Sequence, residues 1–346
     1  MPRTFRVRDI ALQAGVSETT VDRVLNGRPG VRATTVDEVH RAVADLERQR
    51  TQLRLTGRTF VVDVVVDAPE RFTTAVREAL ERTLPVLRPA VLRCRFAFSD
   101  AASPAEVAGR LREAARRGSH GVVLKAPDSP EVVDAVARLR ARGVPVVTLV
   151  TDLPGSARVA YAGIDNRAAG ATAAYLVGRW GGGGRRSVLL ARGRSTFEGE
   201  DARCSGFLGT LREGFPGVRV HQVREDERPG AALGDLVRAA LRADPELDAV
   251  YSAYASGGSA QVPRAFAAEG RHCGFFLVHD LHPEHEQLLR TGGVDVVLHH
   301  DLAGDLRRAC HALLQARGEL PGAPQSWSSS VQVVTPHNPP VPLPLG

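Results

Sequence analysis

Hydrophobic positions alternate regularly between strand-like and helix-like segments from residue 60 onward. Four short apolar runs come first: FVVDVVVD, VLRCRFAF, GVVLKAP and PVVTLVTD. Segments 75–87, 105–116 and 132–140 between them have the spacing of amphipathic helices. A second series of apolar runs follows, again separated by helix-length segments: SVLLARG, VRVHQVRE, LDAVYSAY, GFFLVHDL and VDVVLHHD. Strands that alternate with helices in two series predict two doubly wound α/β lobes with parallel sheets.

The first 46 residues carry a different pattern, with three short amphipathic helices in place of strands. The first helix has to end at Gly15, because glycine tolerates the positive φ of a tight reversal. Ser17 can cap the second helix. The apolar positions of the three helices are Ile10, Ala11 and Ala14; Val21, Val24 and Leu25; and Val36, Val39, Val43 and Leu46. This pattern predicts a helix–turn–helix, and the alternative is a small bundle that docks a protein.

Polar residues remain on the outer side of the second helix, near its N-terminal end, which enters the major groove in this motif. Arg23 can pair with guanine through two hydrogen bonds, and Glu18 can accept one from a cytosine amino group. Charge agrees with a DNA-binding role, because residues 1–60 hold eleven Arg and seven acidic residues, a net +4 of the +6 of the chain.

The segment DIALQAGVSETTVDRVLN resembles the DNA-binding headpiece of the lactose/galactose repressor (LacI) family, whose pattern is approximately D-(V/I)-A-x-x-A-G-V-S-x-x-T-V-S-R-V-(L/V)-N. The resemblance implies that residues 1–58 bind double-stranded operator DNA and that the chain is a homodimer. It places Glu18 and Thr19 at the two base-reading positions and Arg23 where it reads a base or an adjoining phosphate. The phosphate contacts that it implies are Ser17, Thr20, Asn26 and Thr35.

Two features depart from the family pattern. Asp22 replaces the usual serine and brings a carboxylate close to the DNA phosphates, a cost that Arg23 or a neighbouring cation can offset. The hinge segment LERQRTQLRLTGRTF is about two residues shorter than usual and has no proline. Leu53 or Leu55 can still insert into the minor groove as an apolar wedge. The alternative for this segment is a plain linker.

The rest of the chain, residues 59–346, resembles the effector domain of the same family, which is similar to periplasmic sugar-binding proteins. The segment YAGIDNRAAGATAAYLVGRW resembles the crossing from the first lobe to the second. We expect lobe 1 to comprise about 59–163 and 297–322, and lobe 2 about 164–296 and 323–346. Ligands of such sheets collect at the carboxyl ends of the strands, in the cleft between the lobes.

Seven residues are candidate effector contacts that suit a sugar or polyol, and three of them, Asp152, Arg203 and Asp280, match effector-binding positions of the family. Carboxylates accept hydroxyl hydrogens, arginine donates several, and aromatic rings pack on the C–H face of a sugar. The residues are Phe72, Asp152, Phe197, Arg203, Ser252, Asp280 and His300. For each aspartate the alternative is a helix cap. The pair His282 and His285 is expected on a solvated helix and not at a metal.

No nucleotide-binding or catalytic signature is present, so we expect neither an enzyme nor a cofactor. GxGxxG and GxxxxGK[ST] are absent, and the glycine run 181–184 follows a helix. Cys94, Cys204, Cys273 and Cys310 show no metal spacing and are expected to be reduced.

The N-terminus is charged and no apolar run approaches 18 residues, so a cytoplasmic protein without a membrane segment is expected. A dimer is favoured over a tetramer, because the tail has no leucine heptads. The sequence therefore predicts a ligand-controlled regulator, more specifically a repressor. The alternative is a sugar receptor with no role on DNA.

Overall fold

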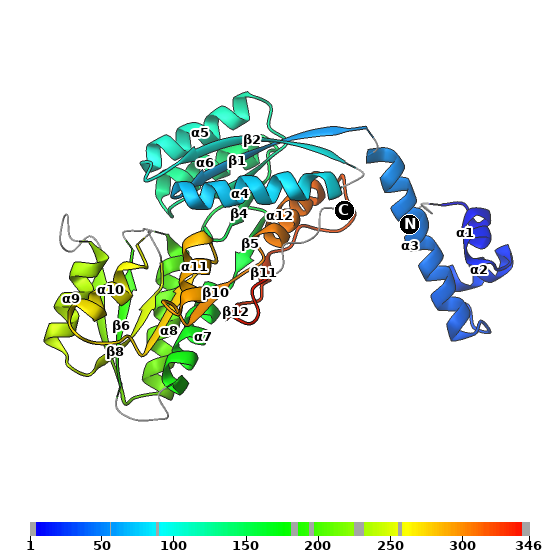
Figure 1. The fold of residues 1–346 in the computed structure, drawn as a ribbon. Coiled ribbons are helices and arrows are strands. Elements are labelled where there is room, and N and C mark those ends of the chain that lie inside the picture. The colour runs from blue at the N-terminus through cyan, green and yellow to red at the C-terminus, as the bar shows by residue number, and fades with distance from the viewer. Residues whose placement is uncertain are drawn as a thin grey trace.

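The computed structural model describes residues 5–55, 57–87, 90–180, 186–193, 197–224, 232–254 and 258–340. For residues 48, 51–55 and 86 it describes the backbone alone. A small helical domain is followed by a body of two α/β lobes, labelled in chain order in Figure 1. The glycine run 181–184 lies outside the described residues. No described helix is long and apolar enough to span a bilayer.

The N-terminal domain is a helix–turn–helix built from α1 (Val7–Ala14), α2 (Glu18–Leu25) and the start of α3 (Ala33–Leu55). Gly15 ends α1 in the left-handed region, at φ 67°, and the Ser17 hydroxyl caps α2 by accepting from Thr20 N at 3.1 Å. The core consists of Ile10, Ala11, Val21, Val24, Val39 and Ala42. Leu25 was predicted there, but it is 36% exposed because it lies one helical position beyond the buried face.

The third helix is longer than its apolar pattern predicts. It continues to Leu55 through the hinge segment, for which the sequence allowed either a helix that contacts DNA or a plain linker. The backbone there is helical, but the side chains of Leu53 and Leu55 lie outside the described residues. Their role as a wedge stays a prediction.

Lobe 1 is a parallel six-stranded sheet with helices on both faces. Its strand order is β11-β5-β4-β3-β1-β2. The strands are β1 (Thr59–Asp67), β2 (Val91–Ser99), β3 (Gly121–Lys125), β4 (Val146–Leu149), β5 (Ala160–Ile164) and β11 (Trp327–Ser329). The helices are α4 (Glu70–Thr83), the 3-10 turn η1 (Leu84–Val86), α5 (Pro104–Arg116), α6 (Pro130–Ala141) and α12 (Leu302–Ala316).

Lobe 2 repeats this plan in the order β12-β10-β9-β8-β6-β7, with β12 antiparallel to β10. The strands are β6 (Arg186–Arg192), β7 (Val218–Arg224), β8 (Leu247–Ser252), β9 (Phe275–His279), β10 (Val296–His299) and β12 (Gln332–Val334). The helices are α7 (Asn166–Trp180), α8 (Glu198–Gly214), α9 (Leu233–Ala243), α10 (Gln261–Ala268) and α11 (Pro283–Thr291).

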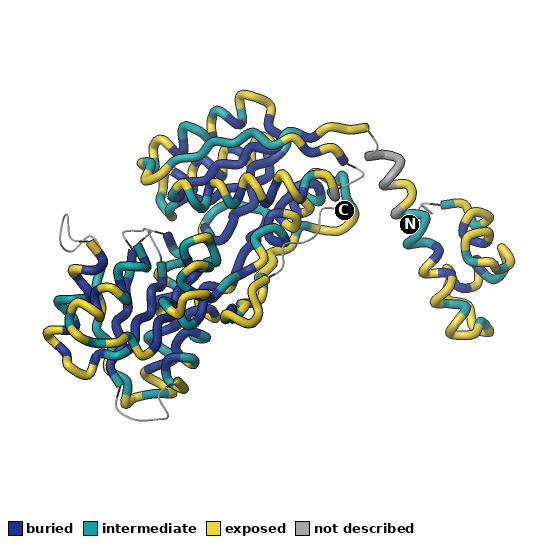
Figure 2. Tube along the Cα trace, viewed as in Figure 1, coloured by how far each residue is buried: buried dark blue, intermediate teal, exposed yellow. Residues whose placement is uncertain are grey.

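Each sheet is buried on both faces, so each lobe has two hydrophobic layers. Figure 2 shows the buried positions concentrated along the strands and the exposed positions on the outer sides of the helices. Such continuous burial explains why the strands read as apolar runs and not as alternating patterns. Cys204 and Cys310 are buried thiols, and Cys94 and Cys273 are half-buried.

The crossings between the lobes correct the predicted boundaries. The first crossing lies between β5 and α7, as expected. The second lies after residue 299 and not at 297, because β10 pairs with β9 of lobe 2. The third lies after residue 329 and not at 323, because β11 pairs with β5 of lobe 1. Both misplaced boundaries involve strands of only three or four residues.

Candidate functional site

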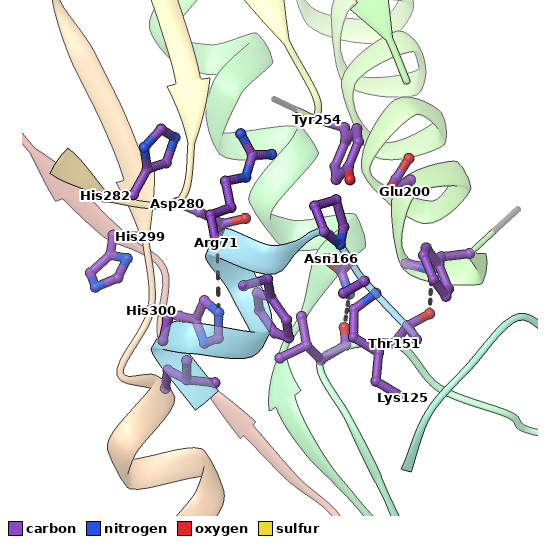
Figure 3. A pocket seen from close by; sticks show the side chains of 18 of the residues that line it. Arg71, Lys125, Thr151, Asn166, Glu200, Tyr254, Asp280, His282, His299 and His300 are labelled. Atoms are coloured by element: carbon purple, nitrogen blue, oxygen red, sulfur yellow. Dashed lines mark hydrogen bonds and ion pairs between the residues drawn. The ribbon is translucent and has the colours of Figure 1, made fainter. Parts of the chain in front are cut away.

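Residues from both lobes converge on a cavity of about 110 Å³ at the carboxyl ends of the strands (Figure 3). Lobe 1 supplies side chains that follow β1, end β3 and follow β4: Arg71, Phe72, Lys125, Val150 and Thr151. Lobe 2 supplies the start of α7 and α8 and the segments after β8, β9 and β10: Asn166, Phe197, Glu200, Arg203, Tyr254, Asp280, His282, His299 and His300. The position agrees with the general rule for doubly wound sheets.

Arg203 is buried at the cavity wall, with 4% of its surface exposed. Its Nε donates to Asn166 Oδ1 at 2.6 Å, and Nη1 donates to the Ala253 carbonyl at 3.2 Å. Asn166 Nδ2 in turn donates to the Val150 carbonyl of lobe 1 at 2.8 Å. A continuous chain of hydrogen bonds therefore joins the two lobes beneath the cavity.

Val150 itself has φ 63°, a left-handed conformation that a β-branched residue rarely adopts. The surrounding bonds hold it there: its N–H donates to Ala162 O at 3.0 Å, and its carbonyl also accepts from the Tyr161 hydroxyl at 3.1 Å. A strained residue held in this way at a cavity wall is typical of a functional site.

Asp280 faces the cavity from the end of β9, also in the left-handed region at φ 64°. Its carboxylate lies 3.9 Å from both Arg203 Nη1 and His300 Nε2. Burial works against ionisation, but Arg203 and His300 lower the pKa of Asp280 below its usual range. His300 Nδ1 lies 2.6 Å from the buried Asp305 carboxylate, which orients the imidazole.

Lys125 ends β3 with its ammonium almost fully buried, at 8% exposure. Nζ lies 3.3 Å from the centroid of the Phe197 ring and 5.5 Å from that of Phe72, both predicted as stacking residues. Its hydrogen bond within the described structure is a long one, 3.5 Å to the Asp67 carbonyl. Burial lowers the pKa of Lys125 to about 8, against the opposing effect of Glu200.

Arg71 and Tyr254 meet across the cleft, with the guanidinium carbon 5.7 Å from the ring centroid. Arg71 Nη1 is buried and has no hydrogen-bond partner within the described part of the chain. Two donor groups, on Arg71 and Lys125, are thus available to a ligand.

The prediction that His282 and His285 lie on a solvated helix is wrong. His285 is fully buried: Nδ1 donates to the Asp280 carbonyl at 2.7 Å, and Nε2 lies 2.9 Å from the Ser259 hydroxyl. His282 lines the cavity and its ring packs against that of His285 in a tilted arrangement, with ring centroids 3.8 Å apart. The described residues contain no group of three or more metal-ligating side chains.

Two predicted contacts lie outside this cavity. Asp152 faces a neighbouring groove, where its carboxylate accepts from Thr148 Oγ1 at 2.7 Å and pairs with Arg158. Ser252 is buried, and its hydroxyl donates to the Tyr254 carbonyl at 2.8 Å. Asp152 and Arg203 therefore line different pockets. The other predicted residues line the cavity: Phe72, Phe197, Arg203, Asp280 and His300.

Several cavity residues were not predicted from the sequence, among them Arg71, Lys125 and Glu200. A usable signal existed for Lys125, because it is the charged residue that ends the otherwise apolar run GVVLK. Arg71 and Glu200 lie in the first turns of helices that follow strands, where polar residues are common for other reasons.

The second candidate site is the outer face of α2 in the N-terminal domain. Glu18, Thr19 and Arg23 are exposed, as the base-reading positions require. Ser17 and Thr20 share a 2.8 Å hydroxyl contact, and Arg23 donates to the Pro29 carbonyl. Two further predicted phosphate contacts border this face: Asn26 at the end of α2 and Thr35 at the start of α3.

The carboxylate of Asp22, which departs from the family pattern, is partly neutralised by other residues of the N-terminal domain. Arg28 Nη1 lies 3.4 Å from its carboxylate. Asn26 Nδ2 donates to Asp22 Oδ1 at 2.9 Å. A neighbouring cation thus offsets the carboxylate, although the cation is Arg28 and not Arg23.

Comparison with known proteins agrees with both parts of this architecture. Residues 61–319 match the family described as periplasmic binding protein domain. The chain belongs to this family. Residues 6–48 match bacterial regulatory proteins of the lacI family, so a lacI-type helix–turn–helix precedes the periplasmic binding protein domain.

Individual relatives and solved structures are similar to this chain over part of its length. The HTH-type transcriptional regulator reg1 of Streptomyces lividans is 33% identical over 234 residues, which are 64% of this chain and 64% of reg1. The chain thus spans less than two thirds of that relative. GanP, a glucose-galactose binding protein from Geobacillus stearothermophilus, has a TM-score of 0.71 at 19% identity over 82% of this chain and 100% of GanP. A putative LacI transcriptional regulator from Bacteroides fragilis has a TM-score of 0.69 at 13% identity over 81% and 98%. The last two show the fold.

Proposed function

We propose that the protein is a sequence-specific transcriptional repressor whose affinity for operator DNA is controlled by a small molecule in the cleft. One observation carries the proposal: a helix–turn–helix with an exposed polar recognition face and a two-lobed body with a cavity lined by charged and aromatic side chains occur in one chain. The relatives named as transcriptional regulators support the first half. The sugar-binding neighbours support a sugar or polyol as the ligand.

Thermodynamic linkage gives the mechanism. A ligand in the cavity touches Lys125 and Phe72 of lobe 1 as well as Arg203 and Asp280 of lobe 2, so it favours one arrangement of the lobes. Operator affinity then changes by the difference between the affinities of the ligand for the two arrangements. The protein acts by binding, not by catalysis, and needs no cofactor.

A homodimer in the cytoplasm completes the proposal. Two helix–turn–helix domains read two half-sites about 34 Å apart on the duplex, so the operator is a pseudo-palindrome. Sedimentation of the full chain with and without a duplex that carries both half-sites measures the stoichiometry. We expect two chains per operator, and one chain per operator would contradict this part.

The test of DNA recognition selects duplexes from a random library with the full chain and measures affinity at fixed salt. For Arg23→Ala we expect a loss of about 1–3 kcal/mol on the selected site, concentrated at one base pair. Arg140→Ala, which removes an exposed cation of α6, is the matched control and leaves affinity unchanged. Binding that is equal on all sequences would contradict the proposal and favour a sugar receptor.

A further inference from the structure

Lys125 is a buried cation that the proposed function does not yet explain. An ammonium group has three donors and is costly to bury unless they are satisfied. Here the described structure gives it the face of Phe197 and one hydrogen bond of 3.5 Å to a backbone oxygen. The residue also lines the cavity between the lobes.

The balance of charge around the cavity is positive. Among the described lining residues the cations are Arg71, Lys125 and Arg203, and the carboxylates are Glu200 and Asp280. Arg203 and Asp280 already lie 3.9 Å from one another. Burial and neighbouring groups lower the pKa of His282 and His299 to about 4, so these two histidines add no charge near neutrality.

Building on the proposed function, we propose that the ligand in the cleft is a small polyhydroxylated anion whose carboxylate or phosphate oxygen accepts from Lys125 Nζ. Glu200 and Asp67 already act on the ammonium electrostatically, but its one hydrogen bond within the described structure is the 3.5 Å contact with a backbone oxygen. A bound anion adds both a hydrogen-bond acceptor and the attraction of a second full charge, whereas a neutral sugar adds the acceptor alone.

The two sides of the cavity suit different parts of the proposed ligand, one its acid group and the other its hydroxyl groups. Figure 3 shows Lys125 and Thr151 on one side of the cavity and His299 and His300 on the other, beside Asp280. Asp280 and His300 suit hydroxyl groups as acceptor and donor. The volume of about 110 Å³ lies well below the range of common ligand pockets, which favours a ligand with a single ring.

The experiment titrates the full chain with three matched probes: D-galactose, D-galacturonate and D-galactose 6-phosphate. Calorimetry and thermal shift are recorded for the natural chain, Lys125→Met, Lys125→Arg and the control Arg140→Met. We expect one of the two acids to bind at least tenfold more tightly than galactose. Lys125→Met removes this preference, Lys125→Arg keeps part of it, and Arg140→Met keeps all of it.

A proton count gives a second readout. The pKa of Lys125 is about 8 before binding. A bound anion raises this pKa, so the lysine takes up protons when the anion binds at pH 8. Calorimetry in two buffers with different ionisation enthalpies detects this uptake. A merely structural lysine gives no such uptake. The two acids also distinguish a carboxylate ligand from a phosphate ligand.

Two results overturn the inference without touching the proposed function. One is galactose binding as tightly as both acids, with the same affinity in Lys125→Met. The other is no binding of either acid to a protein that binds its selected operator. Failure of the natural chain to recognise any operator would instead count against the proposed function.

Discussion

Arg203 Nε donates to Asn166 Oδ1 at 2.6 Å, and this bond ties the cavity wall of lobe 2 to the segment that crosses from lobe 1. Asn166 passes the connection to the strained Val150 carbonyl at 2.8 Å. A ligand that draws the Arg203 guanidinium toward itself must stretch or reorient this bond. The pair is therefore placed to convert occupancy of the cavity into a change of lobe arrangement.

Removing the guanidinium by Arg203→Ala should cost both ligand binding and stability. Asn166 Oδ1 and the Ala253 carbonyl lose their buried donor, so the free energy of unfolding should fall by about 2–4 kcal/mol. Urea denaturation followed by circular dichroism measures this. Arg192→Ala is the control, since Arg192 pairs with the exposed Asp201 and should cost below about 1 kcal/mol. Equal costs would show that the buried link contributes nothing.

Replacing Asp22 with serine, the residue usual in the family, should strengthen operator binding. The change removes a carboxylate that repels phosphates and releases Arg28 from its 3.4 Å pair. We expect affinity to rise about three- to tenfold. It should also depend more steeply on salt, because more counterions are released on binding. Fluorescence anisotropy at salt concentrations from about 50 to 200 mM measures both the affinity and its dependence on salt. Weaker binding by Asp22→Ser would mean that the carboxylate is needed to orient Asn26.

Lys125→Met should make the body more stable although it harms ligand binding. The ammonium is 8% exposed, and its lowered pKa means that the folded state disfavours the charged form. Below pH 8 that penalty is fully present, so an apolar side chain of similar length should add about 1–3 kcal/mol to the free energy of unfolding. Thermal unfolding at pH 7 tests this. A lower melting temperature would show that the contact with Phe197 outweighs the cost of burial.

Stability of the body should fall as the pH is lowered from about 6.5 to about 4. Burial lowers the pKa of His282 and His299 to about 4 in the folded state, so the unfolded chain binds more protons within this interval. Above it their contribution is complete. Melting temperature as a function of pH records the effect, and His299→Gln should flatten the curve. A curve that is flat down to pH 5, or unchanged in His299→Gln, would contradict this assignment.

Long buried elements could be predicted from the sequence, and short ones could not. The run FVVDVVVD predicts β1, because a strand of a sheet that is covered on both faces is apolar at nearly every position. The strand Trp327–Ser329 has three residues, two of them serine, and carries no such signal. Only its pairing with β5 assigns it to lobe 1. The extension of α3 to Leu55 also escaped prediction, because its apolar stripe ends at Leu46 while the backbone continues as a helix.

The candidate site was predicted in part. Arg203 was predicted from a sequence motif, and Asp280 from its place at the end of a predicted strand. The fold brings them within 3.9 Å of one another. Asp152 satisfies the same sequence rule but turns away, because Thr148 and Arg158 of its own lobe already engage its carboxylate. Lys125 was missed because a single lysine at the end of a strand looks like surface charge until the three-dimensional packing shows it buried.

Affinity of the full chain for its selected operator, measured with and without a saturating cleft ligand, tests the central claim most directly. We expect saturation to change the dissociation constant by about tenfold or more, the usual size of an allosteric coupling. In Arg203→Ala the operator should still bind but the ligand should have no effect, with Arg192→Ala behaving as the natural chain. An identical dissociation constant with and without a ligand that calorimetry shows to be bound would contradict the account.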